Sequence, residues 1–397
     1  MELEPFLTSA RELLAIPSTA QRPADLDRAL DFVHGYVKDR AGRPFTTERF
    51  TSNGTPSLLM HPGGTTAGNS VILNGHLDVV PAPEDQFTAR VEGDRLYGRG
   101  AQDMKVSALA MATVFADLAR DLPYPLGLQL VTDEELGGYD GTRHQLEQGV
   151  SCRFAVLGES SGLDISTESK GIANVILTAE GRNAHGAYPW LGDNALLRLH
   201  RSVDRLLARY PVPACEAWRT TVNLARVVTP NVAFNQVPAA AEAWLDIRFP
   251  AGDPDLDSGD SDEVAAYLAG FCDPGVSVEM RRLESPAHAD TSAPEVAALR
   301  DAARRQGYRG EFLRKHGSGD ARFYRARGIN AVSFGIGGAG QHGPSEYAEI
   351  PTILPYYNAL SEFLTGLPQT PELPTRATPG GVPSGGSRCG RRRRSPR

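Results

Sequence analysis

The stretch Val71-Ile72-Leu73-Asn74-Gly75-His76-Leu77-Asp78-Val79-Val80 decides the fold of this 397-residue chain. Its leading residues are apolar or small, which indicates a buried strand. If the strand conformation persists, His76 and Asp78 lie on one face, because side chains alternate between the two faces of a strand. A carboxylate beside an imidazole fixes the ring's tautomer and raises the basicity of its free nitrogen. The alternative is a plain polar pair at a strand end, so the rest of the chain must decide.

Composition points to an ordinary globular protein rather than a membrane or disulfide-rich one. With 397 residues, 41% hydrophobic and 22% charged, the chain predicts roughly two or three domains. No apolar run approaches the length of about 18 residues that spans a bilayer, and the first residues lack the pattern of a secretory signal. The four cysteines are scattered without C-x-x-C spacing. They favour free thiols in a reducing compartment, so the cytoplasm is expected.

The charge of the chain is unevenly distributed. The formal net charge is -7, yet the segment from Pro368 onward holds seven arginines and one glutamate, which leaves 34 basic and 47 acidic residues in the body. An acidic body argues against nucleic acid as the partner. Residues 367–397, rich in Pro, Gly, Ser and Arg, are expected to form a disordered basic tail, with an anion-binding arm as the alternative.

Metal-competent side chains recur where apolar strands end in glycine-rich loops. Strands are expected at 70–73, 126–132, 154–157 and 331–336, with helices at 4–16, 25–41 and 106–118. The side chains that follow these strands are His76, Glu134, Glu135, Glu159 and His342. Asp103 lies just before the helix at 106–118. Because open α/β sheets bind ligands beyond the carboxyl ends of their strands, these groups are expected to converge. The fold class is therefore α/β, with a mostly parallel sheet covered by helices.

A second unit interrupts this pattern. Residues 172–284 predict the order strand, helix, strand, strand, helix, strand, which makes a compact α+β domain. The expected division is a catalytic domain at 1–171 and 285–366 with the α+β domain inserted between its two parts.

Two imidazoles and several carboxylates without cysteine suit a borderline or hard divalent ion such as Zn, Co or Mn. Two ions about 3.5–4 Å apart need a bridging carboxylate, and a water that they share has its pKa lowered toward about 7. An unligated carboxylate beside them can carry that water's proton to a leaving amine. Glu134 and Glu135 offer both functions, one as a ligand and one as a base.

At these positions the chain resembles the dinuclear-zinc hydrolases of the M20 peptidase family, a group that includes acetylornithine deacetylase, succinyl-diaminopimelate desuccinylase, aminoacylase and glutamate carboxypeptidase. The resemblance covers the chain to about Leu364. Its motifs are His76-Leu77-Asp78, Gly98-Arg99-Gly100-Ala101-Gln102-Asp103-Met104-Lys105, Asp133-Glu134-Glu135, Gly158-Glu159 and the late His342. It implies hydrolysis of the amide bond of an N-acyl amino acid or small peptide by a metal-bound hydroxide.

The resemblance also implies a role for each residue of the site. His76 and Glu159 would bind one metal ion, His342 and Glu135 the other, and Asp103 would bridge the two. Asp78 would orient His76, and Glu134 would be the general base. A cis peptide is implied after the bridging aspartate, at Asp103-Met104.

For the inserted domain the resemblance implies a lid that mediates a homodimer. His185 would polarise the scissile carbonyl, either within its own chain or across the dimer. The implied substrate-binding residues are Tyr188, Asn235, Arg248, Gly319 and Arg322. The alternative for His185 is a structural histidine of the lid. The alternative for Arg248 and Arg322 is a plain ion pair, with Asp246 as one partner for Arg248.

The substrate stays open at this stage. The tyrosine of the lid motif and Asp320-Ala321-Arg322 favour a desuccinylase-like deacylase, but the loop before Asp320 is short and Val106-Ser107 replaces the usual glycines. The alternatives are a di- or tripeptidase, a carboxypeptidase, or an enzyme that releases an amino acid from a carrier protein. A catalytically silent metal-binding interaction protein is a further possibility that the intact ligands and base disfavour.

Overall fold

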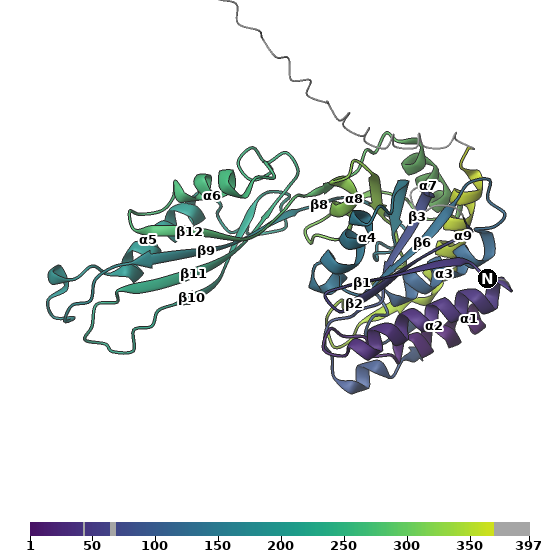
Figure 1. Cartoon of the computed structure of the whole chain (residues 1–397), viewed down its shortest axis with the longest axis horizontal. Helices are drawn as coiled ribbons and strands as arrows, with labels where there is room; N and C mark the ends of the chain where they lie inside the picture. Colours follow the sequence, from purple (N-terminus) through teal and green to yellow (C-terminus); the bar gives the residue numbers. More distant parts are fainter. Residues whose placement is uncertain (43, 64–68, 369–397) are drawn as a thin grey trace, which may run out of the picture.

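The strand expected from the opening stretch lies at the centre of a nine-stranded sheet in the computed structural model, which describes residues 1–42, 44–63 and 69–368 (Figure 1). This strand, β3 (Asn69–His76), is buried at every position but one. Val71 and Leu73 pack into one core and Ile72 into another, on the opposite face. A strand covered on both faces needs no polar side, which explains the continuous apolar run.

The middle of the sheet is parallel. β6 (Leu126–Val131) and β7 (Cys152–Leu157) flank β3 in parallel, and β15 (Asn330–Ser333) runs parallel to β7. Antiparallel pairs extend both edges, through β2 (Thr55–His61) and β1 (Thr46–Ser52) on one side and β8 (Ile165–Ser169) and β13 (Ala287–His288) on the other. β14 (Phe312–Lys315) also pairs with β8, in parallel. The predicted α/β class with a mostly parallel sheet is confirmed.

Helices cover both faces of this sheet. The larger core is formed by α1 (Leu3–Leu14), α2 (Pro23–Ala41), α3 (Lys105–Leu118), α7 (Pro294–Arg305) and α9 (Ile350–Gly366). The smaller core on the other face includes α4 (His144–Glu147) and α8 (Ala321–Arg325) beside a π-helical turn, η4 (Tyr139–Arg143). Every residue of α3 from Lys105 to Phe115 is buried, because α3 packs against the sheet and against α1, α2 and α9. This helix fixes the loop that precedes it.

A small four-stranded sheet joins two segments that are distant in sequence. A hairpin turned at Glu92-Gly93-Asp94 forms from β4 (Arg90–Glu92) and β5 (Arg95–Tyr97). β17 (Tyr347–Glu349) pairs with β5 and with β16 (Gly338–Ala339). The loop that carries Asp103 and the loop that carries His342 are therefore anchored to the same sheet.

The inserted domain forms a separate lobe that extends away from the main sheet (Figure 1). It has the predicted order: β9 (Gly171–Glu180), α5 (Ala195–Arg209), β10 (Thr221–Val228), β11 (Ala240–Phe249), α6 (Ser261–Ala269) and β12 (Val276–Glu284). The four strands pair antiparallel in the order β10-β11-β9-β12, and the lobe has its own apolar core. Its sheet runs from Gly171 to Glu284, close to the expected limits of 172–284.

Two strand expectations need correction. β3 ends at His76, so the strand conformation does not persist to Asp78. The amide N–H of Leu77 still donates to Val131, but that of Val79 donates to Ser18, outside the sheet. The strand expected at 331–336 ends at Ser333. The N–H of Phe334 still donates to Leu157, the last residue of β7, but the carbonyls of Gly335 and Ile336 then accept from the segment after β7, at residues 161–163.

Three short 3₁₀ turns complete the described elements: η2 (Glu84–Phe87), η3 (Glu134–Leu136) and η5 (Pro189–Leu191). None of the helices within the described residues is both long and apolar enough to span a membrane. Of the segment 367–397, which was expected to be disordered, Leu367 is instead buried in the larger core, and residues 369–397 lie outside the described residues.

Candidate active site

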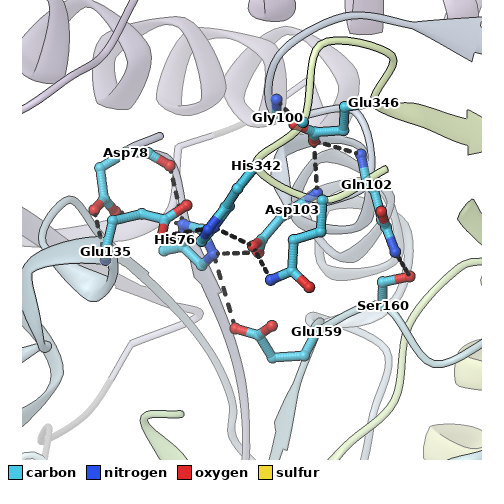
Figure 2. A network of polar contacts seen from close by, with 12 residues as sticks. His76, Asp78, Gly100, Gln102, Asp103, Glu135, Glu159, Ser160, His342 and Glu346 are labelled. Atoms are coloured by element: carbon cyan, nitrogen blue, oxygen red, sulfur yellow. Dashed lines mark hydrogen bonds and ion pairs between the residues drawn. The ribbon is translucent and has the colours of Figure 1, made fainter. Parts of the chain in front are cut away.

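The predicted side chains converge at the carboxyl ends of the parallel strands (Figure 2). His76 is the last residue of β3, Glu134 and Glu135 form the turn after β6, and Glu159 follows β7. His342 comes from the longer connection after β15. Asp103 is added from the loop that precedes α3, and the peptide bond between Asp103 and Met104 is cis, as the resemblance implies. Parallel strands end at one edge of their sheet, so residues far apart in sequence meet there.

Asp103 stands between the two histidines. Its Oδ1 lies 3.0 Å from Nε2 of His76 and its Oδ2 lies 3.3 Å from Nε2 of His342. Glu159 Oε1 is 3.8 Å from Nε2 of His76, whereas Glu135 Oε2 is 3.1 Å from Nε2 of His342. The arrangement therefore consists of two groups, each with one imidazole and one glutamate, that share the carboxylate of Asp103.

His76 is oriented by the residue predicted for that task, but mainly through the backbone. Its Nδ1–H donates to the carbonyl oxygen of Asp78 at 3.0 Å, and the Asp78 carboxylate lies at 3.4 Å. Since a carbonyl can only accept, one proton must be on Nδ1. Nε2, which faces Asp103 and Glu159, is therefore the nitrogen that can bind a metal ion when the imidazole is neutral. The other carboxylate oxygen of Asp78 accepts from the N–H of Glu135 at 3.0 Å, so Asp78 links both groups.

The electrostatics of the site call for bound cations. Burial, together with neighbouring carboxylates, raises the pKa of Glu134 well above its usual range, raises that of Glu135 to about 7, and raises that of Glu159. Burial acts in the same direction on Asp103, but hydrogen bonds from His342 and His76 lower its pKa well below the usual value. Three partly buried glutamates side by side are costly without positive charge.

This donor set fits divalent metal ions. Ligand atoms of His76, Asp103 and Glu135 lie within 4.8 Å of one another, and so do those of His76, Glu134 and Glu159. Imidazole nitrogens and carboxylate oxygens without sulfur suit Zn, Co or Mn. Glu134 thus lies as near to possible ligand positions as Glu159, and distance alone does not separate a base from a ligand. A Cβ added to Gly319 would lie 3.8 Å from Glu134 Oε1, so the glycine loop borders Glu134.

Three residues expected to act on substrate lie together at the far end of the lid. His185 forms an isolated β-bridge with Gln236, the N–H of Gly186 donates to Asn235 at 2.6 Å, and the rings of His185 and Tyr188 are 5.6 Å apart. β9 leads to them from the main lobe over 10 residues, which spans roughly 30 Å. The structure therefore does not bring them to the metal ligands of their own chain.

The two arginines occupy different surroundings. Arg248 lies at the lid end nearest the main lobe, opposite Ile172, with Nε 2.8 Å from Asp246 Oδ1. Arg322 is buried, donates to the carbonyl oxygens of Gly319 and Gly137, and lies 3.4 Å from Glu284. Arg322 thus joins the glycine loop to the turn after Glu134 and Glu135. This position favours the ion-pair alternative for Arg322 and leaves Arg248, which is one-third exposed, available to a ligand.

Sequence reasoning missed several buried charged groups around the site. Lys105 is fully buried, donates through Nζ to the carbonyl of Ile16 at 2.6 Å, and has its pKa lowered by burial to about 7. Burial raises the pKa of Asp133 to about 7 and also raises that of Asp320. Glu346 accepts backbone hydrogen bonds from the Asp103 loop. Lys105, Asp133 and Asp320 belong to motifs identified in the sequence, but a motif does not show whether a charged group is buried. No sequence pattern pointed to Glu346.

Comparisons with known proteins find relatives in sequence and in fold. The model of peptidase family M20/M25/M40 matches residues 72–366. A probable carboxypeptidase of Aspergillus terreus is 33% identical over 276 residues, which are 63% of this chain and 62% of that protein, so the chain spans less than two thirds of its length. A succinyl-diaminopimelate desuccinylase of Cereibacter sphaeroides is 30% identical over 383 residues, 89% of this chain and 96% of the relative.

Among solved structures, aminopeptidase PepT from Bacillus cereus superposes with a TM-score of 0.74 at 15% identity, covering 92% of this chain and 98% of the other. At that identity the likeness concerns the fold alone, and it includes both lobes.

Proposed function

The chain belongs to peptidase family M20/M25/M40, and from this premise we propose that it is a metal-dependent hydrolase of the amide bond of N-acyl amino acids or short peptides. One observation carries the proposal: the two oxygens of Asp103 face two different histidines, at 3.0 and 3.3 Å. A carboxylate in that position is suited to bridge two metal ions.

Two divalent ions are proposed as cofactors, zinc first, with cobalt or manganese as alternatives. His76, Asp103 and Glu159 would hold one, and His342, Asp103 and Glu135 the other. When bound, such ions act as Lewis acids that polarise the substrate carbonyl and make a water nucleophilic at neutral pH.

Glu134 is proposed as the general base. It is the one glutamate of the turn after β6 that does not face His342, and it borders the glycine loop at Gly319. There it can take a proton from the attacking water and deliver it to the leaving amine. Asp78 is proposed to orient the His76 ring, because its backbone carbonyl accepts the hydrogen bond from Nδ1 of His76. Gly319 leaves room for substrate next to Glu134.

The lid is proposed to act across a homodimer. His185 would donate a hydrogen bond to the developing oxyanion of a second subunit, with Asn235 and Tyr188 beside it. Two features support this assembly. The far end of the lid exposes several large apolar side chains: Tyr188, Trp190, Leu191, Val232 and Phe234. In addition, β10 is an edge strand of the lid sheet, and most of its residues are exposed. Exposed apolar clusters and free sheet edges favour association with another chain.

For the substrate we propose an N-acyl amino acid, in the manner of a desuccinylase, with its carboxylate bound by Arg248 and with Arg322 holding the glycine loop. The relative from Cereibacter sphaeroides, matched along nearly its whole length, favours this choice. The second candidate is a carboxypeptidase or a di- or tripeptidase, which the similarity to the probable carboxypeptidase favours. Release of an amino acid from a carrier protein and a catalytically silent protein rank below both.

Cytoplasmic location is proposed from the cysteines. Cys152, Cys215 and Cys272 are free thiols, as expected in a reducing compartment. The acidic body argues against nucleic acid as a partner.

A substrate panel tests the proposal. The protein, stripped of metal and then supplied with zinc or cobalt, is assayed with N-acetyl and N-succinyl amino acids, dipeptides and tripeptides. Metal-dependent release of a free amine from an N-acyl amino acid is the expected result. Activity on peptides alone would favour the second candidate. Full metal occupancy without turnover of any member would favour the silent protein and contradict the proposal.

A further inference from the structure

Glu346 lies behind the metal ligands and has an unusual set of partners. Its side chain is 0% exposed. One carboxylate oxygen, Oε1, accepts backbone N–H groups from Gly100, Gln102 and Asp103 at 3.0, 3.0 and 3.2 Å. The other oxygen pairs with the guanidinium of Arg99. Figure 2 shows the carboxylate among Gly100, Gln102 and Asp103, on the side of Asp103 away from Glu159.

These hydrogen bonds satisfy backbone amides that lie outside any helix or strand. The segment between β5 and α3 has an irregular backbone, with Gly100 at φ +85°, where a Cβ would come within 2.8 Å of Val79. Such a segment has no ladder of its own to satisfy its amides, and buried amides need acceptors. Glu346 supplies one acceptor atom for three of them, including the amide of Asp103. The position of the Asp103 carboxylate therefore depends on Glu346.

The same pair fastens the His342 loop. Arg99 donates from Nη2 to the carbonyl of Gly343, the residue after His342, at 3.1 Å, and the N–H of Gly98 donates to the carbonyl of Glu346 at 3.1 Å. His342 needs this support more than its counterpart does. Its side chain is 48% exposed and comes from a loop, whereas the side chain of His76 is 1% exposed and stands at the end of a central strand.

We propose that Glu346 is a positioning residue that clamps the Asp103 loop to the His342 loop, and that it thereby sets the affinity of the ion held by His342. The proposal rests on the dinuclear site of the proposed function. Loss of the Glu346 carboxylate should weaken the ion of His342 more than the other ion, because it disturbs both Asp103 and His342, whereas His76 and Glu159 keep their places at the ends of β3 and β7. Removal of a group that orients metal ligands lowers metal affinity by about 10–100-fold.

The test compares zinc binding by the wild-type protein, Glu346→Gln and a matched control, Glu295→Gln. Glu295 is also a buried glutamate paired with an arginine, Arg153, at 3.0 Å, but it lies on α7. Zinc content is measured by equilibrium dialysis over a range of buffered free zinc, and thermal unfolding of the metal-free proteins is recorded. The wild type and the control should bind two ions with the same affinities, while Glu346→Gln should bind one ion at least about tenfold more weakly and the other with a smaller loss of affinity.

Each outcome is informative. If folded Glu346→Gln binds both ions with affinities within about twofold of the wild type, the inference is overturned. It is also overturned if Glu346→Gln and the control lose affinity for both ions to the same extent. A wild type that never binds two ions would instead overturn the proposed function. Should Glu346→Gln fail to fold, Arg99→Lys replaces it: this variant keeps the charge beside Glu346 but loses the geometry of the bond to Gly343, and it should weaken the same ion. Unchanged binding by folded Arg99→Lys would then count against the clamp.

Discussion

Mixing two inactive variants tests whether His185 serves the active site of a second subunit. Glu134→Ala removes the proposed base and His185→Ala removes the proposed oxyanion donor. A hydrogen bond requires heavy atoms about 3 Å apart, whereas β9 carries His185 roughly 30 Å from the main lobe of its own chain. Each variant alone should therefore be inactive in both of its sites, since loss of one oxyanion donor costs about 10²–10³-fold in turnover and loss of a base a comparable factor.

The expected recovery follows from the symmetry of a dimer. If equal amounts of the two variants exchange subunits freely, half of the dimers are mixed. In each mixed dimer one site combines an intact Glu134 with an intact His185 from the other subunit. The mixture should then recover about one quarter of wild-type activity.

Subunits are exchanged under conditions that do not unfold the protein, and hydrolysis is measured as release of the free amine. The two variants carry different tags, so that the formation of mixed dimers can be verified. As a control, His185→Ala is mixed with the double variant His185→Ala/Glu134→Ala, which cannot assemble a complete site. Verified mixed dimers that stay as inactive as this control would refute action across the dimer and would require closure of the lid onto its own chain.

Three further predictions concern single residues. Glu134→Ala should lower turnover by about 10²–10⁴-fold while metal analysis still finds two ions per chain; loss of an ion would instead make Glu134 a ligand. Arg322→Met should destabilise the fold by about 3–5 kcal/mol in denaturant unfolding, because it leaves Glu284 and Asp320 without their buried cation; an unchanged unfolding midpoint would show that the pair is not needed. Lys105 has a folded pKa of about 7 against its usual 10.5, so the unfolded chain binds the proton more tightly between these values. The free energy of unfolding of the metal-free protein should consequently rise as pH increases from about 7 to about 10, and Lys105→Met should flatten that rise. An identical pH profile in both proteins would contradict the assignment.

The local signals in this sequence predicted most of the fold because they agree with one another. Apolar runs buried on both faces identified β3, β6 and β7, and a change to alternating residues identified β9. The convergence of His76, Glu135, Glu159 and His342 followed from topology alone, since parallel strands end at one edge. What pattern could not give was the end of β3, because Val79 leaves the sheet to reach Ser18, a partner 61 positions away.

For a related reason, the partners of the buried charged residues could not be predicted from the sequence. Arg322 was expected to meet a substrate carboxylate, yet its closest groups are the carbonyls of Gly319 and Gly137 and the carboxylate of Glu284, which belongs to the last strand of the lid. A charged residue in a motif is equally suited to a ligand or to an internal partner. Only the position of the other elements decides between them, and the contact with Gly137 joins residues separated by the whole lid.

The two halves of the proposed chemistry depend on different levels of structure. All the proposed metal ligands, the base and the residues that orient them come from the main lobe of one chain. They lie where β3, β6 and β7 end and where the loop before α3 meets the connection after β15. The proposed oxyanion donor comes from the far end of the lid, beyond reach of that edge. Under this proposal, a single chain would bind metal with its ligands in place and still lack a complete catalytic site. An isolated subunit would then hold ions without the group that stabilises the transition state, so hydrolysis would require assembly whereas metal binding would require only folding.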